Sequence, residues 1–267
     1  MDPKYKKRAA LVGGLFLAAL VAMFFAPVIP QDPEYHNFAD RRPFLGIPNF
    51  GDVVSNLPFL AVGLAGLFWL ARRDLVGVAG HFLEKEERRA AFVAMFGVFM
   101  TGVGSAYYHW APDNATLFWD RLPMTLVFMS LFASQIMERI SVRAGAQLLV
   151  PLLVFGAASI LSWRYGEEMG KGDLRLYALV QFYPMLAIPL MLALFPSKYT
   201  RTDMIVVVFG WYFLAKILEA ADRPVLRLTL GVVSGHTLKH LAAAAGTGWL
   251  LWWFMKRRPT RASVPQR

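Results

Sequence analysis

The chain has 267 residues, of which 57% are hydrophobic and 17% are charged, and its formal net charge is +10. Such an apolar composition excludes an ordinary soluble domain of this size and indicates a polytopic membrane protein. The chain has no cysteine, which excludes disulfides and thiolate metal sites.

Eight apolar runs are long enough to cross a hydrocarbon core of about 30 Å, which needs roughly 20 helical residues. We expect an all-α integral membrane protein that forms a single helical bundle. The competing interpretation, buried helices of a soluble enzyme, leaves no amphipathic helices to cover these runs. The runs span approximately residues 9–29, 53–71, 90–110, 116–137, 144–163, 176–195, 204–221 and 232–255.

The positive charges are unevenly divided between the two sides of this predicted bundle. If the N-terminus is cytoplasmic, the inner tails and loops hold 18 of the 28 Lys and Arg residues. This asymmetry follows the positive-inside rule, so we expect both termini to be cytoplasmic. It also attributes the net charge to membrane topology, and we expect no nucleic-acid partner. The first run exceeds the apolar core of a signal peptide, which favours an uncleaved anchor over a cleaved leader.

Three of the five histidines fall within or at the ends of apolar runs, where an ionisable side chain needs a partner. His236 and His240 are four residues apart and share one helix face. The alternating topology brings His109 to the same outer level, because one helix ends where the other begins. The other two, His36 and His81, fall in predicted loops and show no feature that distinguishes them from solvated side chains.

Three neutral imidazoles with an open position are a ligand set for catalytic zinc. Asp120 opens the next run from the same side, and Ser105 lies one turn before His109. Zinc lowers the pKa of bound water, so Asp120 can act as a base and Ser105 can donate to a developing oxyanion. Alternatively, the histidine pair arises by chance or forms interhelical hydrogen bonds.

The stretches GVGSAYYHWAPDNATLFWDRLPM and GHTLKHLAA resemble the alkaline ceramidase pattern GxGSxxxH, DxLPM and HxxxH. This family belongs to a superfamily that includes the adiponectin receptors. The resemblance, joined by GDVVSNLPF, runs from about Asn49 to Met255. It implies a seven-helix bundle with zinc on His109, His236 and His240, and Ser105 and Asp120 beside it. The implied divisions are an additional N-terminal transmembrane helix (1–30), an extracytoplasmic loop (31–52), the core (53–255) and a basic tail (256–267).

The resemblance is weaker at the family's acidic calcium-binding stretch. Here Tyr35 falls where the pattern has a glutamate, and Arg41 and Arg42 add repulsion to a cation, so calcium is doubtful. The residues that can still supply oxygen ligands are Asp32, Glu34, Asn37 and Asp40.

A second departure from the pattern is Lys239, which lies between the two histidines of the HxxxH. We expect it to pair with Glu219 or Asp222, with a substrate contact as the alternative. Lys216 competes for Glu219, because these two residues are three apart on one helix.

These patterns predict a zinc-dependent amide hydrolase that cleaves the N-acyl bond of a ceramide-like lipid, with its site on the extracytoplasmic side. The term ceramide comes from the resemblance alone. One alternative is a zinc-containing receptor or scaffold of the adiponectin-receptor type, in which Asp120 closes the metal site. A metal or proton transporter is a third hypothesis, although no polar path continues to the cytoplasmic side.

The Ala-rich and Arg-rich composition favours a bacterial inner membrane, and it leaves the oligomeric state open.

Overall fold

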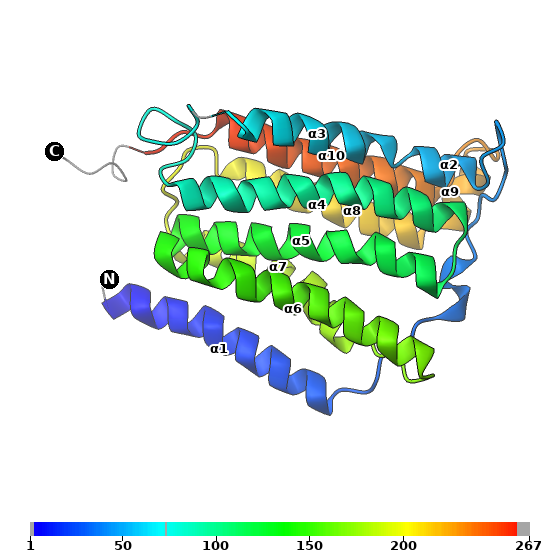
Figure 1. The fold of residues 1–267 in the computed structure, drawn as a ribbon, viewed down its shortest axis with the longest axis horizontal. Coiled ribbons are helices and arrows are strands. Elements are labelled where there is room, and N and C mark those ends of the chain that lie inside the picture. The colour runs from blue at the N-terminus through cyan, green and yellow to red at the C-terminus, as the bar shows by residue number, and fades with distance from the viewer. Residues whose placement is uncertain (1–2, 73, 261–267) are drawn as a thin grey trace.

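A computed structural model describes residues 3–72 and 74–260, and within them every regular element is helical. The long helices lie side by side along one axis (Figure 1). They are α1 (Pro3–Phe25), α3 (Leu57–Leu70), α4 (Lys85–Trp110), α5 (Asn114–Arg139), α6 (Val142–Glu168), α7 (Arg175–Leu194), α8 (Asp203–Ala220) and α10 (Gly235–Lys256). The predicted all-α class is therefore confirmed.

Three short helices complete the described chain: η1 (Pro33–His36), α2 (Phe50–Val54) and α9 (Asp222–Leu228). Pro58 lies in the first turn of α3, where a residue without an amide hydrogen is tolerated. Together α2 and α3 form one apolar stretch, interrupted at Ser55 and Asn56. Helix α9 turns away from α8 by 81°.

Five helical segments are long and apolar enough to cross a membrane, or six if the bent pair α8 and α9 counts as one span. The five are α1, α2 with α3, α4, α6 and α7. Helices α5 and α10 are 26 and 22 residues long but are not among them. Both carry charged or histidine side chains near one end. The chain is an integral membrane protein, and the prediction of seven spans plus one additional helix is not confirmed by this count.

Different helices begin and end at the two ends of the bundle (Figure 1). Helix α1 begins and α10 ends at one end, called here the terminal end. Helix α4 ends and α10 begins at the other, called the histidine end. Helix starts at the histidine end are encoded locally: the side chain of Asp113 accepts a hydrogen bond from Thr116 N at 2.6 Å, and that of Ser234 from Thr237 N at 3.0 Å.

Glycines allow α4 to approach both of its neighbours closely. A Cβ atom added at Gly104 would collide with the carbonyl oxygen of Trp119 on α5, and one at Gly63 would collide with the backbone of Phe99. Small residues at such crossings let helix backbones pack in direct contact, which stabilises helix pairs in a membrane. Gly104 therefore sets the spacing of α4 and α5 close to the histidine end.

Helix α1 lies on the outside of the bundle against α7. The Tyr183 hydroxyl donates to the Val12 carbonyl oxygen at 2.6 Å, and Arg175 Nη1 donates to that of Met23 at 2.8 Å. Most of its apolar side chains remain exposed, as in a helix that faces lipid.

A buried ionic cluster closes the terminal end. Arg257 Nη1 lies 3.1 Å from Glu138 Oε2, and both side chains are fully buried. The Arg257 guanidinium also stacks on aromatic rings, with Tyr199 at 4.1 Å and Trp253 at 4.7 Å. This cluster fixes the end of α10 to the end of α5.

Candidate metal centre at the histidine end

Three histidines from two helices converge at the histidine end. His109 lies in the last turn of α4, while His236 and His240 occupy the first two turns of α10. All three are buried, and one ring nitrogen from each lies within 4.8 Å of the others. Among the described residues this is the cluster of histidine and carboxylate groups that could hold a metal ion. The structure therefore brings together the three residues that the sequence analysis selected as zinc ligands.

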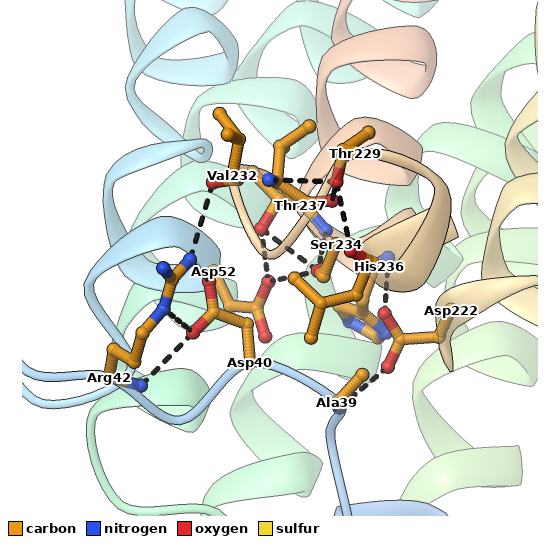
Figure 2. Close-up of polar contacts among 12 residues, drawn as sticks. Ala39, Asp40, Arg42, Asp52, Asp222, Thr229, Val232, Ser234, His236 and Thr237 are labelled. Atoms are coloured by element: carbon orange, nitrogen blue, oxygen red, sulfur yellow. Dashed lines mark hydrogen bonds and ion pairs between the residues drawn. The ribbon is translucent and has the colours of Figure 1, made fainter. Parts of the chain in front are cut away.

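The start of α10 is held in place by contacts from distant parts of the chain. Asp222 Oδ1 accepts a hydrogen bond from His236 N at 2.8 Å, and Asp222 Oδ2 accepts one from Ala39 N at 2.8 Å (Figure 2). One carboxylate thus joins the loop before α2 to α9 and α10. Arg42 Nη2 reaches the Val232 carbonyl oxygen at 3.3 Å from the same loop. These contacts fix the position of His236.

Asp52 is a fully buried carboxylate that the sequence analysis did not single out. Its Oδ1 atom accepts hydrogen bonds from the hydroxyls of Thr237, at 2.7 Å, and Ser234, at 3.5 Å (Figure 2). A Cβ on the neighbouring Gly51 would lie 2.9 Å from Thr237 Oγ1, so α2 and α10 are in close contact there. In the sequence, Asp52 could have been noticed as a charged residue near the start of the apolar stretch GDVVSNLPF.

Ser55 was also missed and contacts a cluster histidine directly. Its hydroxyl lies 2.8 Å from His240 Nδ1 and 3.1 Å from the Asp52 carbonyl oxygen. The carbonyl can only accept, so the hydroxyl proton goes to it, and His240 Nδ1–H donates to Ser55 Oγ. This tautomer leaves the Nε2 lone pair of His240 free. A metal-binding histidine is oriented in the same way by a partner at its second nitrogen.

Lys239 forms the ion pair that the sequence analysis expected. Its Nζ lies 3.0 Å from Glu219 Oε1, and Lys216 pairs with the other oxygen of the same carboxylate. Asp222, the other candidate partner, binds backbone amides instead. The Lys239 ammonium also lies 3.3 Å from His236 Nε2, because its long side chain reaches back to the histidine cluster from the adjacent helix face.

Asp120 and Ser105 are buried and line a cavity of about 320 Å³ that His240 also lines. Asp120 does not belong to the ligand cluster of the three histidines. The structure therefore places both residues beside the cluster, as the spacing predicted, without making Asp120 a fourth member.

The donor chemistry of the histidine cluster and the spacing of one of its pairs fit a metal ion. His109 Nε2 and His236 Nε2 are 3.3 Å apart. Two nitrogens that each lie about 2.0–2.1 Å from one tetrahedral zinc are roughly 3.3–3.4 Å apart, so this separation suits zinc. Burial among apolar side chains favours neutral imidazole, the form that coordinates a metal. Among the described residues His109 Nδ1 has no hydrogen-bond partner, so a partner at the second ring nitrogen is shown for His240 and not for His109.

The four residues that could supply oxygen to the doubtful calcium site make other contacts. Asp32 accepts a hydrogen bond from Glu34 N at 2.9 Å, and Asn37 donates to Glu34 Oε2 at 2.7 Å. Asp40 forms an ion pair with Arg42 at 2.7 Å, and this bonding holds the pKa of the Asp40 carboxyl below its ordinary value. Within the described chain, Asp32, Glu34 and Asp40 do not form a cluster suited to a metal.

His36 differs from the solvated side chain expected of it. Its Nδ1 lies 2.9 Å from the Tyr108 hydroxyl, and its Nε2 lies 2.9 Å from Asn114 Oδ1. It joins the loop before α2 to the ends of α4 and α5. His81 lies at the terminal end, where both ring nitrogens are in contact with Arg258. The expectation was wrong for His36, because loop position in a sequence does not reveal contacts between distant segments, whereas the contacts of His81 are exposed.

Together the fold and this centre define a multi-pass helical membrane protein with a buried three-histidine cluster. A family model described as the dsRNA-gated channel SID-1 matches residues 19–210, which are 192 of the 267 residues. The chain therefore belongs to this channel family. His109 lies inside the matched range, whereas His236 and His240 lie beyond it. No curated protein matches the sequence.

Membership of this family corrects the assignment drawn from the ceramidase-like motifs. The chain is not shown to be an alkaline ceramidase, and the predicted zinc-dependent hydrolysis of a ceramide-like lipid is wrong. The adiponectin-receptor alternative is not supported either. The physical reason is that a few spaced polar residues specify the geometry of a site, and one geometry can serve several functions.

The expected partners are corrected by the same match. The family description names double-stranded RNA, against the predicted absence of a nucleic-acid partner and the predicted lipid substrate. The charge argument failed because it counted where basic residues fall relative to a membrane. That count does not separate residues that orient the chain from residues available to phosphates.

Proposed function

We propose that this protein is a membrane channel component that responds to double-stranded RNA and contains one zinc ion. The family match over residues 19–210 is the observation that supports the RNA part. The convergence of His109, His236 and His240 supports the metal part. When bound, the ion would supply a link between the end of α4 and the start of α10. A cavity of about 320 Å³ lies beside the cluster and is lined by His240.

The proposed topology places α2 with α3 as one span and includes α5 and α10 among the spans. This gives a seven-helix core from residue 53 to residue 255, with α1 as an additional helix before it. The distribution of Lys and Arg supports cytoplasmic termini and an outer histidine end. Exchange of single exposed residues at either end for cysteine, in this cysteine-free chain, would test it by labelling with an impermeant maleimide.

The size of the cavity limits how RNA can act on this chain. A volume of about 320 Å³ is in the range of small-molecule pockets, about 300–1,000 Å³, and does not admit a nucleic-acid duplex. The duplex therefore contacts the surface in this conformation, and its conduction requires an opened state or several chains. At the histidine end, the exposed arginines without an ion pair to a described residue are Arg41, Arg223 and Arg227.

The test uses the full chain in lipid nanodiscs, with metal content and RNA binding measured on one preparation. We expect about one zinc per chain, and saturable binding of a 30-base-pair RNA duplex that weakens as salt rises from about 50 to 200 mM. Binding that is equal for duplex RNA and an anionic polymer such as heparin would contradict the RNA part. His109→Ala should lose zinc, with His36→Ala as the matched control; a metal-free wild-type chain would contradict the zinc part.

A further inference from the structure

Arg121 is a buried cation in the second turn of α5, with 7% of its surface exposed. Its Nη1 atom is buried and has no hydrogen-bond partner. None of the ion pairs among the described residues includes it. An unpaired guanidinium away from water is costly, so a partner for it is expected. The described side chains do not supply that partner.

Aromatic rings surround Arg121 without meeting this need. Its guanidinium carbon lies 5.2 Å from the ring centre of Tyr35, 5.0 Å from that of Trp163 and 5.2 Å from that of Tyr177. These rings come from the loop before α2, from α6 and from α7. They stabilise the positive charge and fix the plane of the group, but they do not accept hydrogen bonds from its N–H groups as a carboxylate or phosphate does.

The side chain of Arg121 lines the same cavity as His240, so a ligand can reach it. The charged residues that line this cavity are Arg121, Lys216, Lys239, Asp120 and Glu219. Three cations and two acids leave one positive charge. Lys216 and Lys239 both bind Glu219, whereas Arg121 forms no ion pair with any described residue. Tyr35 and Tyr177 line the same wall and carry hydroxyl donors.

This cavity lies next to a second, almost wholly apolar cavity of about 140 Å³. The two share lining residues, namely Phe59, Thr101, Met124, Tyr212 and Ala243. A ligand with an anionic group at Arg121 can therefore extend an apolar tail between the helices. A small free anion would use the polar cavity alone.

We propose that Arg121, with Tyr35 and Tyr177, forms a binding site for a single oxyanion, a carboxylate or a phosphate group. The guanidinium provides the charge and the forked donors that such a group takes in pairs. The anion is bound and is not altered. This inference rests on the unpartnered guanidinium and the cavity, and it requires neither zinc nor RNA.

The experiment measures binding to the purified full chain by isothermal titration calorimetry. Three probes separate the sources of the anion: inorganic phosphate, acetate, and laurate at concentrations below its micelle formation. We expect at least one probe to bind with a stoichiometry near one. Tighter binding of laurate than of acetate would assign an anion carried on an acyl chain; equal binding would assign a free anion.

Variants locate the site. Arg121→Gln should weaken binding at least tenfold, and Arg121→Lys should weaken it less, because charge remains while the fork is lost. Arg164→Gln, which removes an arginine paired with Glu168 on its own helix, is the matched control and should bind as wild type. Gel filtration and circular dichroism establish that each variant is folded.

Three outcomes would overturn the proposal. They are the absence of binding by any probe, unchanged binding to Arg121→Gln, and binding that disappears on chelation of zinc but persists in Arg121→Gln. The last outcome would place the anion on the metal. Because zinc content and RNA binding are measured separately, failure here is distinguishable from failure of the proposed function.

Discussion

The hydroxyl of Ser55 lies 2.8 Å from Nδ1 of His240 and fixes which nitrogen of that ring faces the cluster. Ser55 sits at the break between α2 and α3, and His240 lies in the second turn of α10. The contact joins two segments separated by most of the chain. It shows that the centre depends on a helix that supplies none of its histidines.

Ser55→Ala should lower zinc affinity about 10–100-fold, the range found when a partner of a ligating histidine is removed. The imidazole would lose the acceptor that orients it, while the three rings remain. Competition with a fluorescent zinc chelator measures the change. Ser130→Ala, which removes a buried hydroxyl bonded only within its own helix, is the matched control. Equal affinities for wild type and Ser55→Ala would show that the orientation of His240 has another source.

Lys239 and Glu219 should act on zinc affinity in opposite directions. The ammonium lies 3.3 Å from His236 Nε2, so a dication beside that nitrogen is repelled. At an effective dielectric constant of 20, unit charges 4 Å apart interact by roughly 4 kcal/mol, which Glu219 offsets in part. We expect Lys239→Met to raise zinc affinity about tenfold or more and Glu219→Gln to lower it. A change in the same direction for both would refute this electrostatic account.

Gly104→Ala should destabilise the protein by about 1–3 kcal/mol, the cost of overpacking at a close contact. Its methyl group would meet the Trp119 carbonyl oxygen and push α4 from α5 five residues before His109. Gly210→Ala on α8 is the control, because a Cβ there meets no atom within 4 Å. That change should be neutral or slightly stabilising. Thermal unfolding in detergent compares them, and equal melting temperatures for both variants would contradict the prediction.

Asp40 should make stability depend on acid pH through its pairing with Arg42. The pKa of the Asp40 carboxyl is lowered in the folded protein, mainly by the hydrogen bond from Arg42. Its contribution is therefore fully present above the unfolded pKa of about 3.9 and is lost as the pH falls through the lower folded value. Melting temperatures between about pH 5 and pH 3 should fall less steeply for Asp40→Asn than for wild type. Parallel curves would rule out this contribution.

Much of the histidine end could be predicted from local sequence. The capping residues Asp113 and Ser234 lie within three residues of the predicted run starts at 116 and 232, and the interval between His236 and His240 places both rings on one face. Topology then brought His109 to the same level. Residues such as Arg121 and Ser55 could not be assigned in this way. Arg121 matters because its buried guanidinium has no hydrogen-bond partner at Nη1 among the described residues. Ser55 matters because it contacts the ring of His240, which is distant in sequence.

The sequence by itself determined that this is an all-helical membrane protein and that three histidines meet at one end of it. Periodicity and apolar length are local properties, so they are readable along the chain. Only the tertiary structure decided that Ser55 orients His240, that Asp222 holds the start of α10, and that Arg121 faces a cavity while forming no ion pair with a described residue. These features arise from contacts between segments far apart in sequence, and burial makes each polar contact, or its absence, energetically large.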